Sequence, residues 1–244
     1  LVIDLVSWRV ILQEIEEILE SGTLSAKKPF PFQAWCKLQA EYAQQHLIPS
    51  KVLPFDIAPA DYAYWGMTNQ ANFYSDVVSE SFIIDADTTS TLLGSCHKAL
   101  GTEPVEVFVA TLLHAFQQTF IDRAMPTVFS EGHGREPWDQ EIDLSGTVGW
   151  FTTMAPLHVP VLDGADVVDI VRRTKDIRRS LPGNGWPYFT SRFLNVEGAK
   201  AFGSHFPMEI LFNYLGRYQQ LEREDGLLRL EPQVAEVAVP DVGQ

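Results

Sequence analysis

The 244-residue sequence contains both amphipathic helix patterns and short strand-like segments. One broad apolar face marks a helix over Thr102–Phe120, where Thr102 suits the N-cap and Pro104 the first turn. A strand-like segment, Pro126–Ser130, leads into a charged, glycine-rich stretch. Apolar residues form 45% of the chain and charged residues 20%, the composition of an ordinary globular protein.

The first 75 residues contain two helix patterns and an irregular segment. Val6–Leu19 repeats apolar residues at three- and four-residue spacing, and a Ser-Gly pair ends it. Asp4 lies just before this helix, where its carboxylate can cap the helix or pair with Arg9. Phe30–Gln45 is the second helix pattern, and Ile48–Asn72 is a proline- and aromatic-rich loop or crossover.

A strand pattern at Ser79–Asp85 follows that loop and places a boundary near residue 75.

The five basic residues late in the Asp166–Arg179 helix favour a solvated face, with docking of an acidic partner as the alternative. The other expected elements are a helix at Asp87–Leu100, an apolar section at Trp150–Val159, a Pro/Gly turn at Leu181–Tyr188 and a strand at Glu209–Tyr214.

Charge and cysteine content exclude several classes of protein. Acidic residues outnumber basic ones 32 to 18, giving a net charge of −14, which argues against nucleic acid as a partner. No apolar run reaches the roughly 18 residues of a membrane span. Cys36 and Cys96 lie far apart, so we expect two buried free thiols in a reducing compartment.

The segment Ser130–Thr153 concentrates the groups that could carry chemistry. Glycines let the backbone approach a neighbour closely, and ionisable groups beside an apolar run are expected to have shifted pKa values. The spacing of its histidine and carboxylates matches no zinc signature, so we expect no metal. The residues in question are Glu131, Gly132, His133, Gly134, Arg135 and Glu136.

Several motifs together resemble the epimerization domains of nonribosomal peptide synthetases. They occur in the family's order: a D-x-V-S-W-R segment at Asp4–Arg9, EGHGRE at Glu131–Glu136, TVGWFT at Thr147–Thr152, LPGNGWPY at Leu181–Tyr188 and FNYLG at Phe212–Gly216. The resemblance covers nearly the whole chain. It implies the two-lobed, chloramphenicol-acetyltransferase-like α/β fold, with mixed sheets flanked by helices and incomplete at both ends.

The resemblance also implies a division of the chain. Residues 1–75 would form the C-terminal part of the first lobe and residues 76–244 the second lobe. The family's H-H-x-x-x-D motif would end at Asp4, with its two histidines just before Leu1. We therefore expect this segment alone to be inactive.

The implied reaction inverts the α-carbon of an L-aminoacyl or peptidyl thioester by removing and returning a proton. Glu131 would act on one face and the second histidine of the motif on the other. Asn213 and Tyr214 would join the active site, and Arg135 could pair with a carboxylate or stabilise the enolate oxygen. The implied supporting residues are Asp4, Gly132, His133 and Gly134.

The implied enzyme is cytoplasmic and needs no cofactor of its own. Its substrate would be tethered to the phosphopantetheine arm of a peptidyl carrier domain, and its other partners would be neighbouring synthetase domains. Two alternatives remain. One is a condensation domain that joins two carrier-bound substrates, and the other is a catalytically silent carrier-docking module, which Leu5 in place of the family's usual Gly leaves open.

Overall fold

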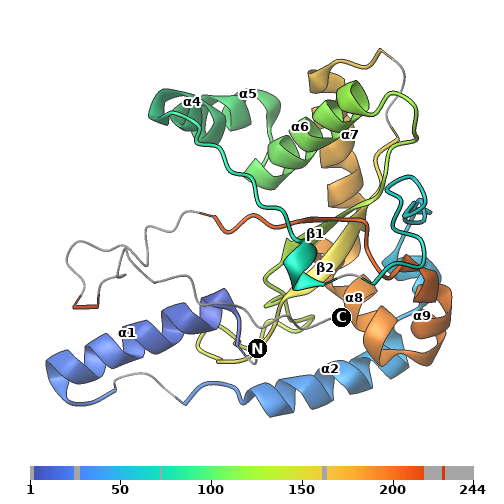
Figure 1. Ribbon diagram of the computed structural model, residues 1–244. Coiled ribbons are helices and arrows are strands. Elements are labelled where there is room, and N and C mark those ends of the chain that lie inside the picture. The colour runs from blue at the N-terminus through green and yellow to red at the C-terminus, as the bar shows by residue number, and fades with distance from the viewer. Residues whose placement is uncertain (1–2, 25–27, 72, 161–163, 217–226, 229–244) are drawn as a thin grey trace.

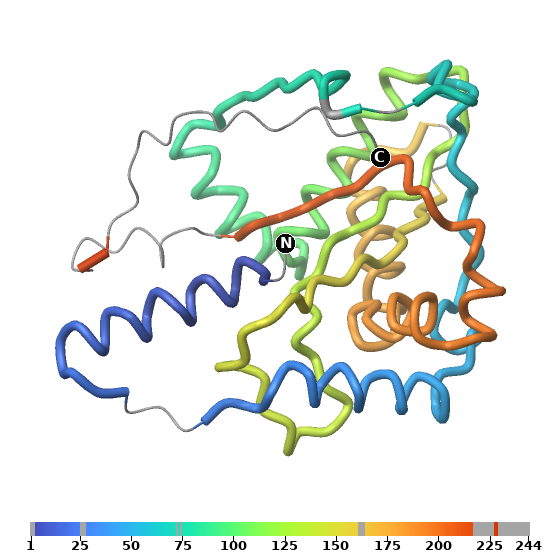
Figure 2. Tube along the Cα trace, turned by 60° about the horizontal axis from the view of Figure 1, so that its bottom comes forward, coloured from blue at the N-terminus to red at the C-terminus, as the bar shows by residue number. Residues whose placement is uncertain are grey.

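The computed structural model of the chain describes residues 3–24, 28–71, 73–160, 164–216 and 227–228. Helices surround a small central sheet, and α1 extends away from the rest of the molecule (Figures 1 and 2). The α-helices in the described part are α1 Leu5–Ser21, α2 Phe32–His46, α3 Pro49–Val52, α4 Ala86–Thr91, α5 His97–Leu100, α6 Pro104–Thr119, α7 Val167–Ser180, α8 Trp186–Leu194 and α9 Val196–Ala201.

The sheet is mixed and has the strand order β2-β1-β3 in the described residues. The central strand β1 (Val128–Gly132) pairs antiparallel with β2 (Thr153–Leu157) and parallel with β3 (Ile210–Phe212). All three strands lie where the sequence predicts strand or apolar segments. Strand β1 runs two residues further than predicted, so Glu131 and Gly132 belong to the sheet.

Local capping signals determine how the long helices begin. Asp4 caps α1 by accepting a hydrogen bond from the Ser7 amide, and Asp166 caps α7 in the same way. The N-cap of α6 is Glu103, so the prediction of Thr102 is wrong. Glu103 and Glu106 form a reciprocal capping box around Pro104, which satisfies more backbone amides than a single threonine could.

The basic end of α7 packs on α6, so the predicted solvated face is wrong for its last turns. Glu106 is fully buried and accepts hydrogen bonds from Arg179 at 2.9 Å and Arg178 at 3.4 Å. Lys175 donates to the Leu100 carbonyl at 3.0 Å. Arginine side chains thereby neutralise a buried carboxylate that would otherwise be strongly destabilising.

Three local predictions are corrected. The expected helix over Asp87–Leu100 is divided by a π-helical turn at Leu92–Cys96 between α4 and α5. The Pro/Gly turn predicted at Leu181–Tyr188 is present at Pro182–Gly185, but Trp186–Tyr188 belong to α8 and not to the turn. Cys36 is exposed and Cys96 half-buried, so these thiols are free but not buried.

The predicted strand at Ser79–Asp85 is wrong. These residues form no regular element, and Phe82 and Ile83 are 87% and 97% exposed. A strand needs a partner for its backbone groups, and none pairs with this segment in the described part of the chain. The boundary near residue 75 stays a prediction. Val52 and Leu53, which precede it, pack in the same core as Val109.

The core forms where α6, α7 and α8 meet the sheet, and helices α7 and α8 both contact β2. A smaller aromatic cluster lies between α2 and the loop after β1, where Trp138 stacks on Trp35 and Tyr42 with ring centroids 5.1 and 4.0 Å apart. No described helix has the length and apolar character required to cross a bilayer.

Close packing of α9 on α8 requires a glycine at position 198. A Cβ there would lie 2.2 Å from the Ser191 carbonyl oxygen. We therefore expect Gly198→Ala to lower the free energy of unfolding by about 1–3 kcal/mol, measured by chemical denaturation. Gly203→Ala is the matched control, because a Cβ at that position meets no atom within 4 Å. Equal stability of the two variants would contradict this account.

Candidate active site

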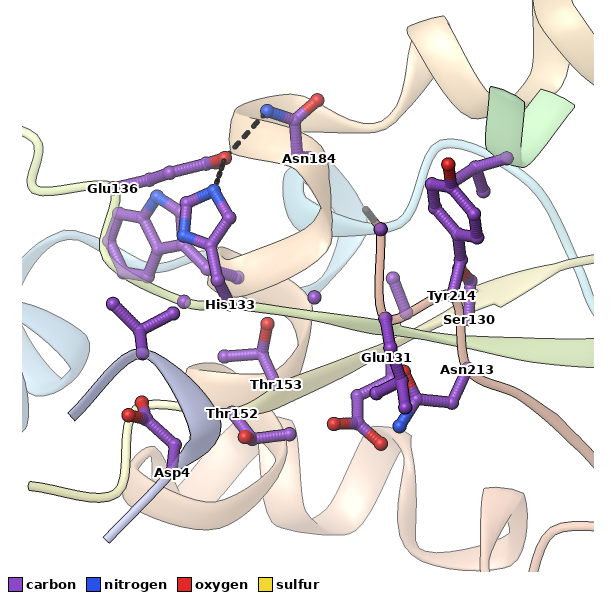
Figure 3. Close-up of a pocket in the computed structure, with 18 of the residues that line it drawn as sticks. Asp4, Ser130, Glu131, His133, Glu136, Thr152, Thr153, Asn184, Asn213 and Tyr214 are labelled. Atoms are coloured by element: carbon purple, nitrogen blue, oxygen red, sulfur yellow. Dashed lines mark hydrogen bonds and ion pairs between the residues drawn. The ribbon is translucent and has the colours of Figure 1, made fainter. Parts of the chain in front are cut away.

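A pocket of about 340 Å³ opens at the end of the sheet where β1 and β3 terminate. Its walls come from the N-terminus of α1, from β1 and β2, from the residues after β3, and from the turn before α8 (Figure 3). Seven of the eight residues that the resemblance assigns to the site line it: Asp4, Glu131, Gly132, His133, Gly134, Asn213 and Tyr214.

The parallel pairing of β1 with β3 brings Glu131 and Asn213 together. Ser130 is the register partner of Phe212, so the residues that follow them, Glu131 and Asn213, lie side by side at the C-terminal ends of the two strands. Burial raises the pKa of Glu131, and a hydrogen bond from the Asn213 side chain partly offsets this effect. The site therefore contains a carboxyl group whose pKa lies closer to neutrality than that of an exposed glutamate.

Asp4 and Arg135 form a buried ion pair beside the pocket. Arg135 Nη2 lies 2.9 Å from Asp4 Oδ1, and the two side chains are 7% and 5% exposed. Burial alone would raise the pKa of Asp4. Hydrogen bonds from Ser7 and Arg135, together with the charge of Arg135, outweigh it and hold that pKa below its ordinary value. The prediction that Asp4 caps α1 is confirmed, but its ionic partner is Arg135 and not Arg9.

The same guanidinium organises the loop between β1 and β2. Arg135 Nη1 donates to the carbonyls of Leu144 at 3.1 Å and Thr147 at 2.6 Å. Its central carbon lies 3.9 Å from the centroid of the Phe151 ring. Arg135 does not line the pocket. With its Nη1 and Nη2 donors directed at protein acceptors, it is placed to position the site rather than to contact a substrate.

Different steric reasons favour glycine at Gly132 and at Gly134 of the EGHGRE motif. Gly134 has φ +62°, and a Cβ there would lie 1.8 Å from the Phe151 carbonyl oxygen, so a side chain cannot be accommodated. At Gly132 a Cβ would come within 3.3 Å of the Thr153 hydroxyl, which is tight but less severe. Both let the strand end and the following turn approach β2 closely.

His133, Glu136 and Asn184 form a polar rim at one side of the pocket (Figure 3). Glu136 Oε1 accepts a hydrogen bond from Asn184 at 2.9 Å and lies 3.5 Å from His133 Nε2. His133 Nδ1 accepts from the Arg135 amide at 3.1 Å, which places any ring proton on Nε2. His133 thus helps to fix the turn that carries Arg135.

Sequence reasoning did not assign Arg9, Arg178 or Asn184 to the pocket, although all three line it. Arg9 follows Leu5 by four residues, so helical periodicity places both on one face of α1. Arg178 is held by Glu103 at 2.7 Å and Glu106 at 3.4 Å, whereas Arg9 has no ion-pair partner within the described ranges. No described group of three or more His, Cys, Asp or Glu residues is arranged to hold a metal.

Comparison with known proteins gives consistent matches. The family model described as "Condensation domain" matches residues 1–238. The nonribosomal peptide synthetase ungA' of Aspergillus campestris is 53% identical over 232 residues, which are 94% of this chain and 2% of that protein. Nonribosomal peptide synthetase 1 of Aspergillus fumigatus is 48% identical over 229 residues, 94% of this chain and 4% of that protein. The chain thus spans a small fraction of these relatives.

Two solved structures illustrate the fold. The epimerization domain from the third module of tyrocidine synthetase B matches with a TM-score of 0.59 and 25% identity, over 80% of this chain and 45% of that one. VibH, a condensation enzyme, matches with a TM-score of 0.55 and 16% identity, over 83% of this chain and 46% of that one. These matches confirm the predicted α/β fold of mixed sheet and flanking helices.

Replacing Arg135 tests the buried ion pair. Arg135→Ala leaves the Asp4 carboxylate buried without its counter-charge, so we expect the free energy of unfolding to fall by about 3–5 kcal/mol. The matched control is Lys200→Ala, which breaks a pair whose side chains are 70% and 69% exposed and should change stability little. Chemical denaturation measures the free energy of unfolding of both variants. Similar decreases in the two would contradict a larger stabilising contribution from the buried Asp4–Arg135 pair.

The raised pKa of Glu131 predicts a pH-dependent stability. Above the ordinary value of 4.5, the folded state retains a proton that the unfolded chain releases, so stability of the wild type falls as the pH rises. Gln cannot ionise, so the stability of Glu131→Gln relative to wild type should rise as the pH is raised from below 4.5 to above it. Denaturation across this range is the measurement, with the exposed Glu141→Gln as control. A difference that stays constant with pH would contradict the raised pKa.

Proposed function

The chain belongs to the condensation-domain family of nonribosomal peptide synthetases, and on this premise we propose that it is part of an epimerization domain. The observation that carries the proposal is the half-buried Glu131, which lines the pocket and receives a hydrogen bond from Asn213. A general acid–base group works best when its pKa lies near the working pH, and burial moves the pKa of Glu131 in that direction.

The proposed reaction needs one proton removed and one returned. The Glu131 carboxylate takes the α-proton of a carrier-bound aminoacyl or peptidyl thioester, and the C–H electron pair delocalises into the thioester carbonyl as an enolate. Protonation of the α-carbon from the other face gives the inverted centre. In a two-base mechanism a second group serves that face, and the resemblance assigns this role to the second histidine of the H-H-x-x-x-D motif.

The other pocket residues fit supporting roles in this chemistry. Asn213 holds the Glu131 carboxyl, and the Tyr214 hydroxyl is available to donate a hydrogen bond to the substrate. Arg9 takes the role expected of Arg135, because it lines the pocket and Arg135 does not. A guanidinium in the pocket would favour the negative charge that develops on the enolate oxygen.

The proposed setting is a cytoplasmic multidomain synthetase. The substrate would reach the pocket on the phosphopantetheine arm of a peptidyl carrier domain, and the domain would need no cofactor of its own. Condensation remains the second candidate, because VibH and other condensation enzymes share the fold. It would require an amine acceptor in place of proton return.

Isotope exchange separates these functions. In the full-length protein we expect Glu131→Gln to slow solvent-deuterium incorporation at the substrate α-carbon by about 10²- to 10⁴-fold, because Gln cannot take the proton. Deuterium wash-in is measured separately from L- and D-loaded carrier, and the face that Glu131 serves should lose more. Glu141→Gln, an exposed residue outside the pocket, is the control.

The outcomes are distinct. Wash-in that remains within a few-fold of wild type in Glu131→Gln would remove Glu131 as the acid–base group. Equal loss from both substrate forms would favour a one-base mechanism. Absence of exchange in the wild type, with amide product formed from two loaded carriers, would replace epimerization by condensation.

A further inference from the structure

A second polar cluster, formed by Asp61, Trp65, Arg123 and Glu209, lies outside the pocket and ends where β3 begins. The Glu209 carboxylate accepts hydrogen bonds from Arg123 Nη1 at 2.5 Å and Nη2 at 3.1 Å. It also accepts from the Asp61 amide at 3.0 Å and from Trp65 Nε1 at 2.5 Å. One carboxylate thus joins the crossover segment, the residues after α6 and the start of β3. We call these four residues the Glu209 cluster.

The ion pair at the centre of the cluster is shielded from solvent, whereas Asp61 and Trp65 at its margin are exposed. The Arg123 and Glu209 side chains are 7% and 4% exposed. The Arg123 guanidinium carbon lies 4.8 Å from the Tyr64 ring centroid and 5.3 Å from that of Trp65. Burial raises the pKa of Glu209, but its hydrogen bonds and the charge of Arg123 outweigh burial and hold the pKa below its ordinary value. The bidentate pair is therefore charged and fixed in direction.

The position of Glu209 in the chain connects this cluster to the site. Glu209 immediately precedes β3, and Asn213 immediately follows it. Strand β3 has three residues and lies at the edge of the described sheet, so β1 alone holds it on one side. The Tyr62 hydroxyl reinforces this end by donating to the Met208 carbonyl at 2.8 Å. So short an edge strand needs an anchor outside its own ladder to keep its register.

We propose that Glu209 and Arg123 are positioning residues, which anchor β3 in the register that places Asn213 against Glu131. They touch neither the pocket nor the reacting atoms and act through the strand. The proposal rests on the proposed function of Glu131. Its structural part, the anchoring of β3, can be tested without any activity.

The first measurement is hydrogen exchange of backbone amides, followed by mass spectrometry on the full-length protein. Glu209→Gln should speed exchange in the peptide that contains Ile210–Phe212 and leave the peptide of β2 unchanged. Arg123→Lys, which keeps the charge but loses the bidentate fork, should give a smaller increase. Unchanged exchange over β3 in Glu209→Gln would overturn the anchoring role.

The second measurement is the pH dependence of α-proton exchange. Glu131 must be ionised to act as a base, so the rate rises with pH through its pKa. Without the Asn213 hydrogen bond the pKa of Glu131 rises further. The acid limb, the low-pH part of the pH–rate profile where the rate increases with pH, then moves to higher pH. We expect the same shift in Glu209→Gln and in Asn213→Ala, with a rate loss of about 10- to 100-fold in Glu209→Gln. The other charged or titratable groups of the pocket are Asp4, Arg9, His133, Glu136, Arg178 and Tyr214.

The double variant Glu209→Gln/Asn213→Ala decides whether the two residues act through one path. If Glu209 works by placing Asn213, the double variant shows no shift beyond that of Asn213→Ala alone. Additive shifts would overturn the proposal. Ile170→Ala, a fully buried core change in α7, is the control: it should lower thermal stability without moving the acid limb.

Failure of the proposal and failure of the proposed function give different results. If Glu131→Gln exchanges α-protons like wild type, Glu131 is not the base, and the hydrogen-exchange experiment alone judges the anchor. If Glu131→Gln is impaired but Glu209→Gln keeps the wild-type acid limb, the positioning role is wrong and the assignment of Glu131 stands.

Discussion

The buried ion pair between Arg135 and Asp4 is the interaction on which the arrangement of the pocket depends. It joins the N-terminus of α1 to the loop after β1, two segments 131 positions apart in the chain. The same arginine holds the carbonyls of Leu144 and Thr147, so the loop before β2 takes its shape from one guanidinium. Because buried charges of this kind are costly unless they are paired, the pair ties the start of α1 to the loop between β1 and β2.

The second constraint is the mixed sheet itself. Because β1 and β3 are parallel, their C-terminal ends lie next to each other. The Glu131 carboxyl group at the end of β1 therefore meets the Asn213 side-chain amide that follows β3. The position of that amide depends on β3, a strand of only three residues. Contacts at the N-terminal end of β3, where Glu209 lies, therefore affect the position of Asn213 at the other end. The Glu209 cluster and the Asp4–Arg135 pair both contain a buried, hydrogen-bonded ion pair.

The fold does not determine which reaction the pocket performs. Epimerization and condensation domains share this architecture, and function depends on the groups that a particular site presents. Here the pocket presents a half-dry glutamate with a raised pKa, a neighbouring amide and a guanidinium from α1. This combination suits the removal and return of a proton beside a carbonyl, and it is the reason for favouring epimerization.

The sequence by itself determined the features that depend on near neighbours. Helical periodicity located α1, α6 and α7, and the cap position identified Asp4. The grouping of Glu131 with Asn213 and Tyr214, which are distant in the chain, came instead from the resemblance of the ordered motifs. Only the tertiary structure decided the partner of Arg135, the place of Arg9 in the pocket and the absence of a strand at 79–85 among the described residues. Caps and helix faces are set within one or two turns of chain. The Asp4–Arg135 pair and the pairing of β1 with β3 instead join residues that lie far apart in the chain, 131 positions apart for that ion pair.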